Sequence, residues 1–220
     1  VFVSWLPLYH DMGLIGAWFG SLYFAMPLVL MSPLAFLARP SRWLQAISRH
    51  RGTLTAAPNF AYELCAKKLD DADLAGLDLS SLRLALNGAE PVSQATLEAF
   101  IQRFVPHGLQ PEAITPVYGL AECSVGLAFP PLGRGPRIDT IRRDAFIGEK
   151  RAVPAAEGET GTMLLPACGR ALPGHEIRIV GEAGDELPDR QVGCLQFRGP
   201  SATRGYFRNP EATARLFRDG

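Results

Sequence analysis

The sequence has few cysteines and no arrangement of them that would hold a metal ion. Its four cysteines, Cys65, Cys123, Cys168 and Cys194, are widely spaced, with no C-x-x-C pair and no histidine at the spacing of a metal ligand. This pattern argues against a cysteine-based metal centre and favours reduced thiols over a disulfide framework. We therefore expect four free cysteines and a cytoplasmic protein.

An excess of charge of either sign is also missing. Lysine plus arginine and aspartate plus glutamate number 22 each, so no overall field draws the protein toward nucleic acid or an anionic surface. With 220 residues, 47% of them hydrophobic, the chain can bury a substantial core. The first ten residues contain neither the basic segment of a signal peptide nor an initial methionine, so we interpret the chain as an internal piece of a longer protein.

Charged residues are absent from 12–38, a run that is long enough to span a bilayer. Pro27 and Pro33 divide this run into a helix-length piece and the strand-length piece PLVLM. Buried elements of an α/β fold have the same character. We predict core elements here and no transmembrane segment.

Internal repeats are absent too, and what the first 129 residues show is an alternation of short β-rich runs with helical ones. Such alternation predicts an α/β fold with a mostly parallel sheet and covering helices. The carboxyl ends of the strands would share one edge, which is where ligands bind in such sheets. The expected strands are 1–7, 27–32, 52–58, 82–88 and 114–119, and the expected helices are 11–25, 40–50, 58–69, 92–105 and 120–128.

The composition changes after Phe129. Residues 130–165 are rich in glycine, proline and charge and weak in periodicity, which indicates an insertion-like excursion across the surface. In 166–220, the runs EIRIV and CLQFRG are separated by turn signals, which predicts a small antiparallel β-subdomain. Its last residues, NPEATARLFRDG, have the pattern of a short helix, and we expect this subdomain to be truncated.

A polar pair, His10 and Asp11, follows the first expected strand and precedes an apolar helix that contains Gly13. Two interpretations remain open. Asp11 can cap the helix with His10 packed on it, which explains most of the pattern by itself. Alternatively, the start of the helix and His10 border a ligand cavity.

The segment NGAEP, residues 87–91, follows the fourth expected strand and ends at Pro91, which we expect to open a helix. Gly88 and Ala89 carry little side chain, so a flat ring could lie on the backbone while exposed N–H and C=O groups read its edge. An ordinary strand-to-helix turn explains the same residues.

The segment YGLAE, residues 118–122, places one carboxylate in an otherwise uncharged run. Tyr118 could stack on a planar base from the side opposite NGAEP, and Glu122 could bind a divalent metal ion that bridges phosphates. The alternative keeps Tyr118 in the core and places Glu122 at a helix N-terminus. Each motif alone leaves the choice open.

Taken together, these motifs resemble those of the adenylate-forming ligases of the acyl-CoA synthetase and luciferase superfamily. The similarity covers nearly the whole chain, because LPLYHDMGLIG, NGAEP, PVYGLAE, GRALPGHEIRIV and GCLQFRGPSATRGYF occur in that family's order. The resemblance implies that ATP and Mg²⁺ are used to convert a fatty acid to acyl-AMP and pyrophosphate, before the acyl group passes to a thiol.

The resemblance also implies roles for individual residues. Glu122, as metal ligand, and His10 would be the catalytic residues, and the acyl pocket would be bordered by His10, Asp11 and Gly13. The backbone of NGAEP and the ring of Tyr118 would enclose the adenine. The residues implied in binding ATP or AMP are Asn87, Gly88, Ala89, Glu90, Tyr118, Gly119, Leu120 and Ala121.

One branch of the superfamily is the most similar, the fatty acyl-AMP ligases, which pass the acyl group to the phosphopantetheine thiol of an acyl carrier protein. It shares the form YGLAE, with Ala121 where many relatives have threonine, and an insertion at the place of 130–165. A long-chain acyl-CoA synthetase that uses CoA and a non-catalytic nucleotide- or acyl-binding module are the alternatives. The phosphate loop, the ribose-binding aspartate and the catalytic lysine of the family have no counterpart in this sequence, so we expect the piece alone to be inactive.

Overall fold

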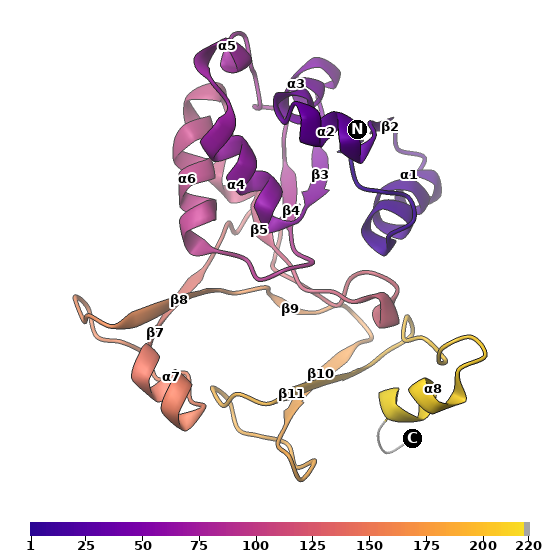
Figure 1. Ribbon diagram of the computed structural model, residues 1–220, viewed down its shortest axis with the longest axis vertical. Helices are drawn as coiled ribbons and strands as arrows, with labels where there is room; N and C mark the ends of the chain where they lie inside the picture. The colour runs from indigo at the N-terminus through magenta and orange to yellow at the C-terminus, as the bar shows by residue number, and fades with distance from the viewer. Residues whose placement is uncertain (218–220) are drawn as a thin grey trace.

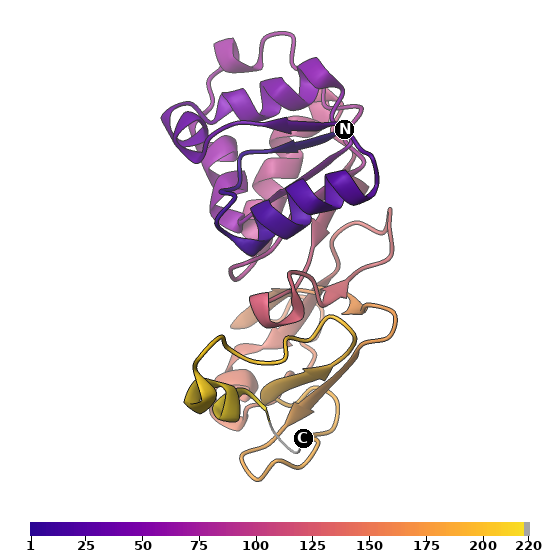
Figure 2. The same cartoon turned by 90° about the vertical axis from the view of Figure 1, so that its right-hand side faces the viewer.

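The computed structural model describes residues 1–217 and contains a larger α/β body and a smaller body built mainly of β-strands (Figures 1 and 2). A five-stranded parallel sheet in the order β2-β1-β3-β4-β5 forms the centre of the α/β body. The strands are β1 (Phe2–Ser4), β2 (Leu28–Leu30), β3 (Leu54–Ala57), β4 (Leu84–Asn87) and β5 (Ile114–Pro116). Each of the five lies within a predicted strand, and their parallel pairing confirms the predicted fold class.

Helices lie on both sides of this sheet, with α4 and α6 on one side and the helix formed by η1 and α1 on the other (Figure 1).

Helix α2 was not predicted, because Pro33 was interpreted only as a break. Ser32 in fact caps α2, its Oγ accepting a hydrogen bond from the backbone N of Ala35 at 3.1 Å, and Pro33 occupies the first turn. Helix α6 begins after its cap Ser93, so the expectation that Pro91 opens it is wrong. The helices are η1 (Met12–Phe19, a π-helix), α1 (Gly20–Tyr23), α2 (Pro33–Ala38), α3 (Ser41–His50), α4 (Asn59–Lys68), α5 (Asp71–Leu74) and α6 (Gln94–Phe104), with 3₁₀ turns η2 (Val105–His107) and η3 (Pro111–Ala113).

Aromatic side chains form a continuous series through the core of the α/β body. The ring centroids of Trp5 and Trp43 lie 6.4 Å apart, those of Trp43 and Tyr62 5.4 Å, and those of Tyr62 and Phe100 5.0 Å, all in edge-on contact. The indole N–H of Trp43 donates to Thr55 Oγ1 at 2.9 Å, so its polar atom is satisfied within the core. This packing fixes the strands on which the candidate site is built.

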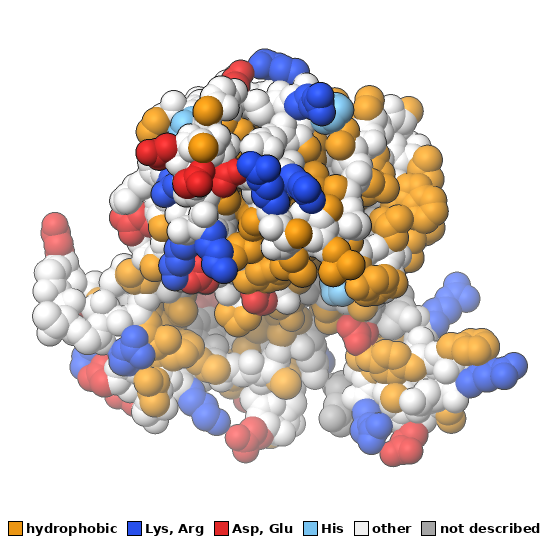
Figure 3. Space-filling view, turned by 45° about the horizontal axis from the view of Figure 1, so that its top comes forward, with side chains coloured by type: hydrophobic (Ala, Val, Ile, Leu, Met, Phe, Trp, Pro, Cys, Tyr) orange, Lys and Arg blue, Asp and Glu red, His pale blue; other side chains and the backbone are white. Residues whose placement is uncertain are grey.

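The uncharged run 12–38 forms η1, α1, β2 and α2, and no helix in the described part of the chain is long and apolar enough to cross a bilayer. Several of its large side chains are nevertheless exposed, and Figure 3 shows hydrophobic side chains gathered on this side of the α/β body. The exposed ones include Trp18, Phe19, Leu22, Tyr23, Phe24, Leu34 and Leu37. All four cysteines are free, as predicted, and burial raises the pKa of the Cys65 thiol.

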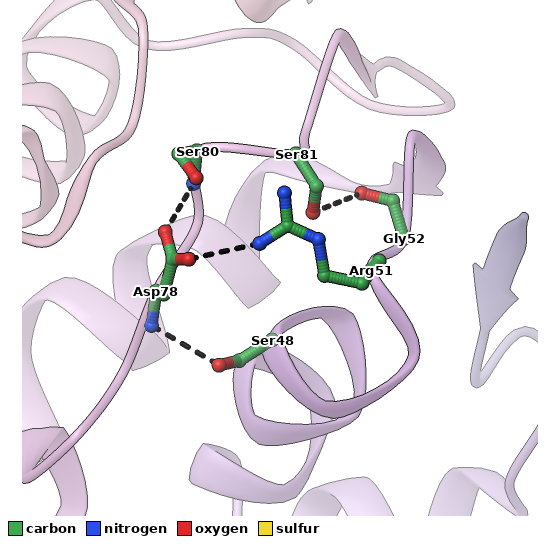
Figure 4. Close-up of polar contacts among 6 residues, drawn as sticks. All are labelled: Ser48, Arg51, Gly52, Asp78, Ser80 and Ser81. Atoms are coloured by element: carbon green, nitrogen blue, oxygen red, sulfur yellow. Dashed lines mark hydrogen bonds and ion pairs between the residues drawn. The ribbon is translucent and has the colours of Figure 1, made fainter.

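A polar cluster joins the end of α3 to the loop that leads into β4 (Figure 4). Arg51 Nη1 contacts Asp78 Oδ2 at 3.0 Å, and the backbone N of Asp78 donates to Ser48 Oγ at 3.1 Å. The other carboxylate oxygen of Asp78 accepts from the backbone N of Ser80 at 2.9 Å. These contacts hold the loop from which β4 starts.

The smaller body contains the predicted antiparallel hairpin, in which β10 (Glu176–Val180) pairs with β11 (Cys194–Arg198). The 130–165 segment has more regular structure than the sequence suggested, because β7 (Ile138–Arg142) pairs antiparallel with β8 (Thr162–Pro166) and α7 (Arg143–Glu149) lies between them. Strand β7 was not predicted because it contains few apolar residues, and only Ile141 of this strand is fully buried. The remaining elements are β6 (Ala128–Phe129), which pairs with β9 (Arg170–Ala171), and α8 (Pro210–Leu216).

The 130–165 segment is attached to the β10–β11 hairpin. Arg190 Nη2 contacts Asp139 Oδ2 at 2.9 Å, and the backbone N of Ala152 donates to the carbonyl O of Arg190 at 2.8 Å. A second backbone bond runs from Val192 N to Lys150 O at 2.8 Å. The segment is therefore held by the smaller body rather than projecting from it.

Candidate active site

The carboxyl edge of the parallel sheet brings the NGAEP and YGLAE segments together, as expected. Asn87 is the register partner of Pro116, and the backbone N of Val117 donates to the carbonyl O of Asn87 at 2.9 Å. A Cβ added at Gly88 would come within 2.9 Å of the Val117 carbonyl O. Glycine at this position therefore lets the two chain segments approach each other, and this close approach explains the glycine without a bound ring.

The side chain of Asn87 is fully buried and points into the protein. Its Nδ2 donates to Asn59 Oδ1 at 3.3 Å, and that same oxygen accepts from the backbone N of Ser93 at 3.0 Å. Asn59 Nδ2 in turn donates to Thr96 Oγ1 at 3.3 Å. This network ties the end of β4 to the first turns of α4 and α6, and it leaves Asn87 Oδ1 buried without a hydrogen-bond partner among the described residues.

The next two residues of NGAEP face outward. Ala89 is exposed and adopts a left-handed backbone conformation with φ of 68°, which is uncommon for alanine and is found at constrained turns. Glu90 Oε1 accepts a hydrogen bond from the backbone N of Phe60 at 2.6 Å. The Glu90 carboxylate therefore caps the start of α4 and fixes the loop, in which the Ala89 backbone is the exposed element.

His10 and Asp11 form the helix cap that the sequence allowed. Asp11 Oδ1 accepts from the backbone N of Met12 at 2.7 Å, and His10 Nδ1 lies 2.7 Å from the same carboxylate oxygen. His10 is exposed beyond the carboxyl end of β1, and Gly13 is buried in η1. The cap accounts for the contacts of the pair, and the exposed imidazole remains available to a ligand.

Glu122 does not start a regular helix, so the predicted helix 120–128 is wrong. The segment contains only the 3₁₀ turn η4 (Ala121–Cys123), and it is closed by backbone bonds between Tyr118 and Ala128, from Tyr118 N to Ala128 O at 3.1 Å and back at 2.9 Å. A Cβ on Gly119 would lie 1.8 Å from the carbonyl O of Val125, so this loop requires glycine there. Glu122 lies in the 3₁₀ turn η4 of this loop.

The turn after Glu122 is strained. Ser124 has φ of 62° and ψ of −60°, and the backbone N of Val125 donates to the carbonyl O of Cys123 at 2.7 Å. These features define a γ-turn of the rare positive-φ form. The Ser124 hydroxyl donates to the carbonyl O of Ser201 at 3.3 Å, which anchors the turn to the loop after β11.

The loop after β11 also holds Glu122 itself. The backbone N of Thr203 donates to the carbonyl O of Glu122 at 2.7 Å, and the hydroxyl of Tyr206 donates to Glu122 Oε1. The hydrogen bond to Glu122 raises the pKa of the Tyr206 phenol, and desolvation and the charge of Glu122 act in the same direction. Tyr206 therefore stays protonated at neutral pH and acts as the donor.

A cavity of about 720 Å³ lies beside this turn. Tyr118, Leu120 and Glu122 line one wall, and residues of β10, β11 and 199–203 line much of the rest. The Tyr118 ring is 40% exposed, so it is not a core residue and the alternative that kept it in the core is wrong. Of the described residues, neither those of NGAEP nor His10 contribute to this lining, so the structure groups Tyr118, Leu120 and Glu122 but does not bring all predicted site residues into one cavity.

A metal ion at this site would depend on Glu122. Among residues 1–217, no group of three or more His, Cys, Asp or Glu side chains is arranged to hold a metal ion. Mg²⁺ does not need such a group, because it is usually bound by one or two carboxylates together with substrate phosphates and water. Glu122, half-buried and with one oxygen taken by Tyr206, fits such a ligand.

Sequence reasoning assigned no role to Ser201, Thr203 and Tyr206, although they lie in the quoted motif GCLQFRGPSATRGYF. Their contacts with the Glu122 turn span 77 to 84 residues of sequence. A short motif cannot show a partner so far away. The available signal was the turn-rich run GPSATRG, which follows β11 and leads to Tyr206.

Comparison with known proteins gives the same class of fold. The model of the AMP-binding enzyme family matches residues 1–207, so this chain belongs to that family. A long-chain-fatty-acid–AMP ligase of Mycobacterium bovis is 42% identical over 98% of the chain, which spans 37% of that protein. A medium-chain-fatty-acid–[acyl-carrier-protein] ligase of Teredinibacter turnerae is 40% identical over 96% of the chain, which spans 33% of that protein.

Solved structures are similar as well. A structure from work on fatty acyl-adenylate ligases of E. coli and L. pneumophila superimposes with a TM-score of 0.94, at 36% identity, over 98% of this chain and 39% of its own. The fatty acyl-adenylate ligase of L. pneumophila in complex with acyl adenylate and pyrophosphate superimposes with a TM-score of 0.91, at 35% identity, over 96% of this chain and 37% of its own. This chain thus spans between a third and two fifths of these relatives.

Proposed function

We propose that the protein containing this chain is a ligase that activates a fatty acid with ATP, releases pyrophosphate and passes the acyl group from acyl-AMP to a carrier-protein thiol. Membership of the AMP-binding enzyme family supports the nucleotide, and relatives named as fatty-acid–AMP ligases support the fatty acid. The single observation that carries the proposal is that Tyr118 and Glu122 line the same cavity, close in sequence to the carboxyl end of β5.

Within this proposal, Tyr118 stacks on the adenine, and the backbone around Gly88 and Ala89 reads the edge of the ring. The exposure of Tyr118 at the cavity supports the stacking role. Glu122 is the metal ligand, and when bound the Mg²⁺ offsets negative charge on the phosphates. His10, exposed at the end of β1, borders the acyl pocket next to the apolar helix η1.

The reaction needs little covalent chemistry from this chain. An oxygen of the fatty acid carboxylate forms a bond to the α-phosphorus while the bond to the pyrophosphate oxygen breaks in line with it. The protein contributes by holding the two reactants in that geometry and by stabilising the charge that develops on the phosphate oxygens. The rigid anchoring of the Glu122 turn to 201–206 supports such a positioning role.

The acceptor distinguishes the two enzyme alternatives. The carrier-protein thiol is favoured by the Teredinibacter turnerae relative, whose name specifies an acyl-carrier-protein ligase. It is also favoured by the anchored 130–165 segment, which resembles the insertion of the fatty acyl-AMP ligases. An acyl-CoA synthetase that transfers to CoA is the second candidate.

The test uses the full-length protein with fatty acid, Mg²⁺-ATP and labelled pyrophosphate. Exchange of label into ATP that depends on fatty acid is expected, followed by acylation of holo carrier protein in preference to CoA. Apo carrier protein, which lacks the phosphopantetheine thiol, is the control acceptor. Efficient acyl-CoA formation would favour the second candidate, and the absence of any exchange would favour a non-catalytic binding module.

A further inference from the structure

The contact between Tyr206 and Glu122 joins two segments that lie 84 residues apart. We propose that Tyr206 is a positioning residue for Glu122, holding Oε1 by its hydroxyl so that Oε2 is presented to the metal ion. The inference rests on the proposed function, because it concerns how the metal ligand of that site is oriented. Neither the family match nor the names of the relatives assign a role to Tyr206.

The backbone around Glu122 is already fixed, and its side chain is the part that remains free to move. Thr203 N holds the Glu122 carbonyl O at 2.7 Å, and Ser124 Oγ holds the Ser201 carbonyl O at 3.3 Å. A glutamate side chain has several rotatable bonds, and ordering it costs conformational entropy. A hydrogen bond to one carboxylate oxygen removes most of that freedom before the metal ion arrives.

Tyr206 is itself held in place by α8. Its backbone N donates to Thr213 Oγ1 at 2.9 Å, and that hydroxyl donates to the carbonyl O of Asn209 at 2.8 Å. Asn209 Oδ1 caps the helix by accepting from Ala212 N at 3.0 Å. The backbone of Tyr206 is therefore held by the first turn of α8, and the carboxylate of Glu122 is linked to that helix through the Tyr206 side chain.

Positioning fits the chemistry better than blocking. An ionised carboxylate has about four acceptor sites, and the Tyr206 hydroxyl occupies only one of them, on Oε1. Mg²⁺ takes one or two carboxylate ligands with the rest of its coordination from phosphate and water, so a single free oxygen is enough. A neutral phenol also leaves the negative charge of Glu122 in place.

The experiment measures metal binding by the full-length protein without turnover. Mn²⁺ replaces Mg²⁺, ATP is present at a fixed concentration and fatty acid is omitted. Binding to the protein is measured by electron paramagnetic resonance as the change in the Mn²⁺ signal relative to the same Mn²⁺-ATP solution without protein. Tyr206→Phe is expected to weaken Mn²⁺ binding about tenfold, the range in which partners of metal ligands act. The matched control is Tyr9→Phe, because Tyr9 is 91% exposed, and it should bind Mn²⁺ as the wild type does.

A double-mutant cycle assigns the effect to Glu122. In a Glu122→Gln background, Tyr206→Phe should cause no further loss of Mn²⁺ affinity. In pyrophosphate exchange, Tyr206→Phe should raise the half-saturating Mg²⁺ concentration about tenfold and leave the rate at saturating Mg²⁺ near the wild-type value. Thr213→Val removes the anchor of Tyr206 while keeping the shape of the side chain, and should weaken Mn²⁺ binding in the same direction by a smaller factor.

Wild-type or tighter Mn²⁺ binding by Tyr206→Phe would overturn the proposal, and so would an equal loss in the Glu122→Gln background. If Tyr206→Phe does not fold, Thr213→Val decides, and unchanged Mn²⁺ binding by that variant counts against the proposal. A wild-type protein that binds no Mn²⁺ with ATP would overturn the proposed function together with this inference. If the wild-type protein binds Mn²⁺ with ATP and the Tyr206→Phe variant binds it equally well, this inference alone is overturned.

Discussion

The two bodies of the molecule hold their residues in place by different means. In the α/β body, large side chains such as Trp43, Tyr62 and Phe100 are almost completely buried in one continuous core. The smaller body has few buried apolar side chains within the described residues, Ile141 and Val180 among them, and its loops are tied by hydrogen bonds and ion pairs. Packing therefore fixes the sheet edge, and polar contacts fix the Glu122 turn.

This difference has a consequence for the site. Hydrogen bonds are directional and each contributes a modest net free energy, so a site held by them can be altered without unfolding the protein. A core held by packing cannot be changed so locally, because the loss of a large side chain leaves a cavity. Substitutions in the two bodies should therefore separate stability from activity.

The largest effect on stability is expected from truncation in the α/β core. Phe100→Ala should lower the free energy of unfolding by about 3–5 kcal/mol, because the ring is 1% exposed and its removal leaves a cavity. Denaturant unfolding of the full-length protein measures the change. Phe207→Ala is the matched control, since that ring is 88% exposed in the smaller body and its loss should matter little. Equal losses for the two variants would contradict the comparison.

The same contrast explains what could be predicted from sequence. The five strands were predictable because each is a short β-rich run followed by polar residues, and this pattern lies within the local sequence of each strand. The helix expected at 120–128 was wrong because a local apolar pattern cannot reveal that Tyr118 pairs with Ala128 through the backbone. The sequence alone suggests Glu122 as a candidate ligand, which stays a prediction, but it could not reveal the contact with Tyr206, since that contact depends on tertiary structure.

A large effect on rate with little effect on stability is expected at the turn. Glu122→Gln in the full-length protein should reduce acyl-AMP formation roughly a hundredfold or more, because the amide lacks the charge that the metal ion needs. Its melting temperature should stay near the wild-type value, as the backbone bond to Thr203 is retained.

The control for this variant is Glu186→Gln, which makes the same change of charge at another residue lining the cavity. It should leave pyrophosphate exchange nearly unchanged. If Glu186→Gln loses as much activity, the effect comes from the overall charge of the cavity. A Glu122→Gln protein that melts earlier and keeps its rate would indicate a structural role for the carboxylate.

A smaller effect is expected at the core of the 130–165 segment. Ile141→Val removes one methylene group from a side chain that is 0% exposed, and should cost about 1 kcal/mol of unfolding free energy. Ile147→Val makes the same change on a side chain that is 67% exposed and should cost close to nothing. Thermal unfolding of the full-length protein compares the two. Indistinguishable melting curves would show that this segment has no core of its own.

The smallest effect is expected from the polar cluster at the surface of the α/β body. Hydrogen bonds from Ser80, with the charge of Arg51, hold the pKa of Asp78 below its usual value (Figure 4). A carboxyl with a lowered folded-state pKa stabilises the protein above the unfolded pKa of about 3.9, and that contribution is lost as the pH falls through the folded-state value. Asp78→Asn should therefore lower the melting temperature slightly at pH 7, and the difference from wild type should shrink as the pH falls below about 4. Asp189→Asn, in the exposed turn between β10 and β11, makes the same change of charge and is the control, and its melting temperature at pH 7 should stay near the wild-type value. A loss at pH 7 as large as that of Phe100→Ala would mean that polar contacts are as important to the α/β body as its packing.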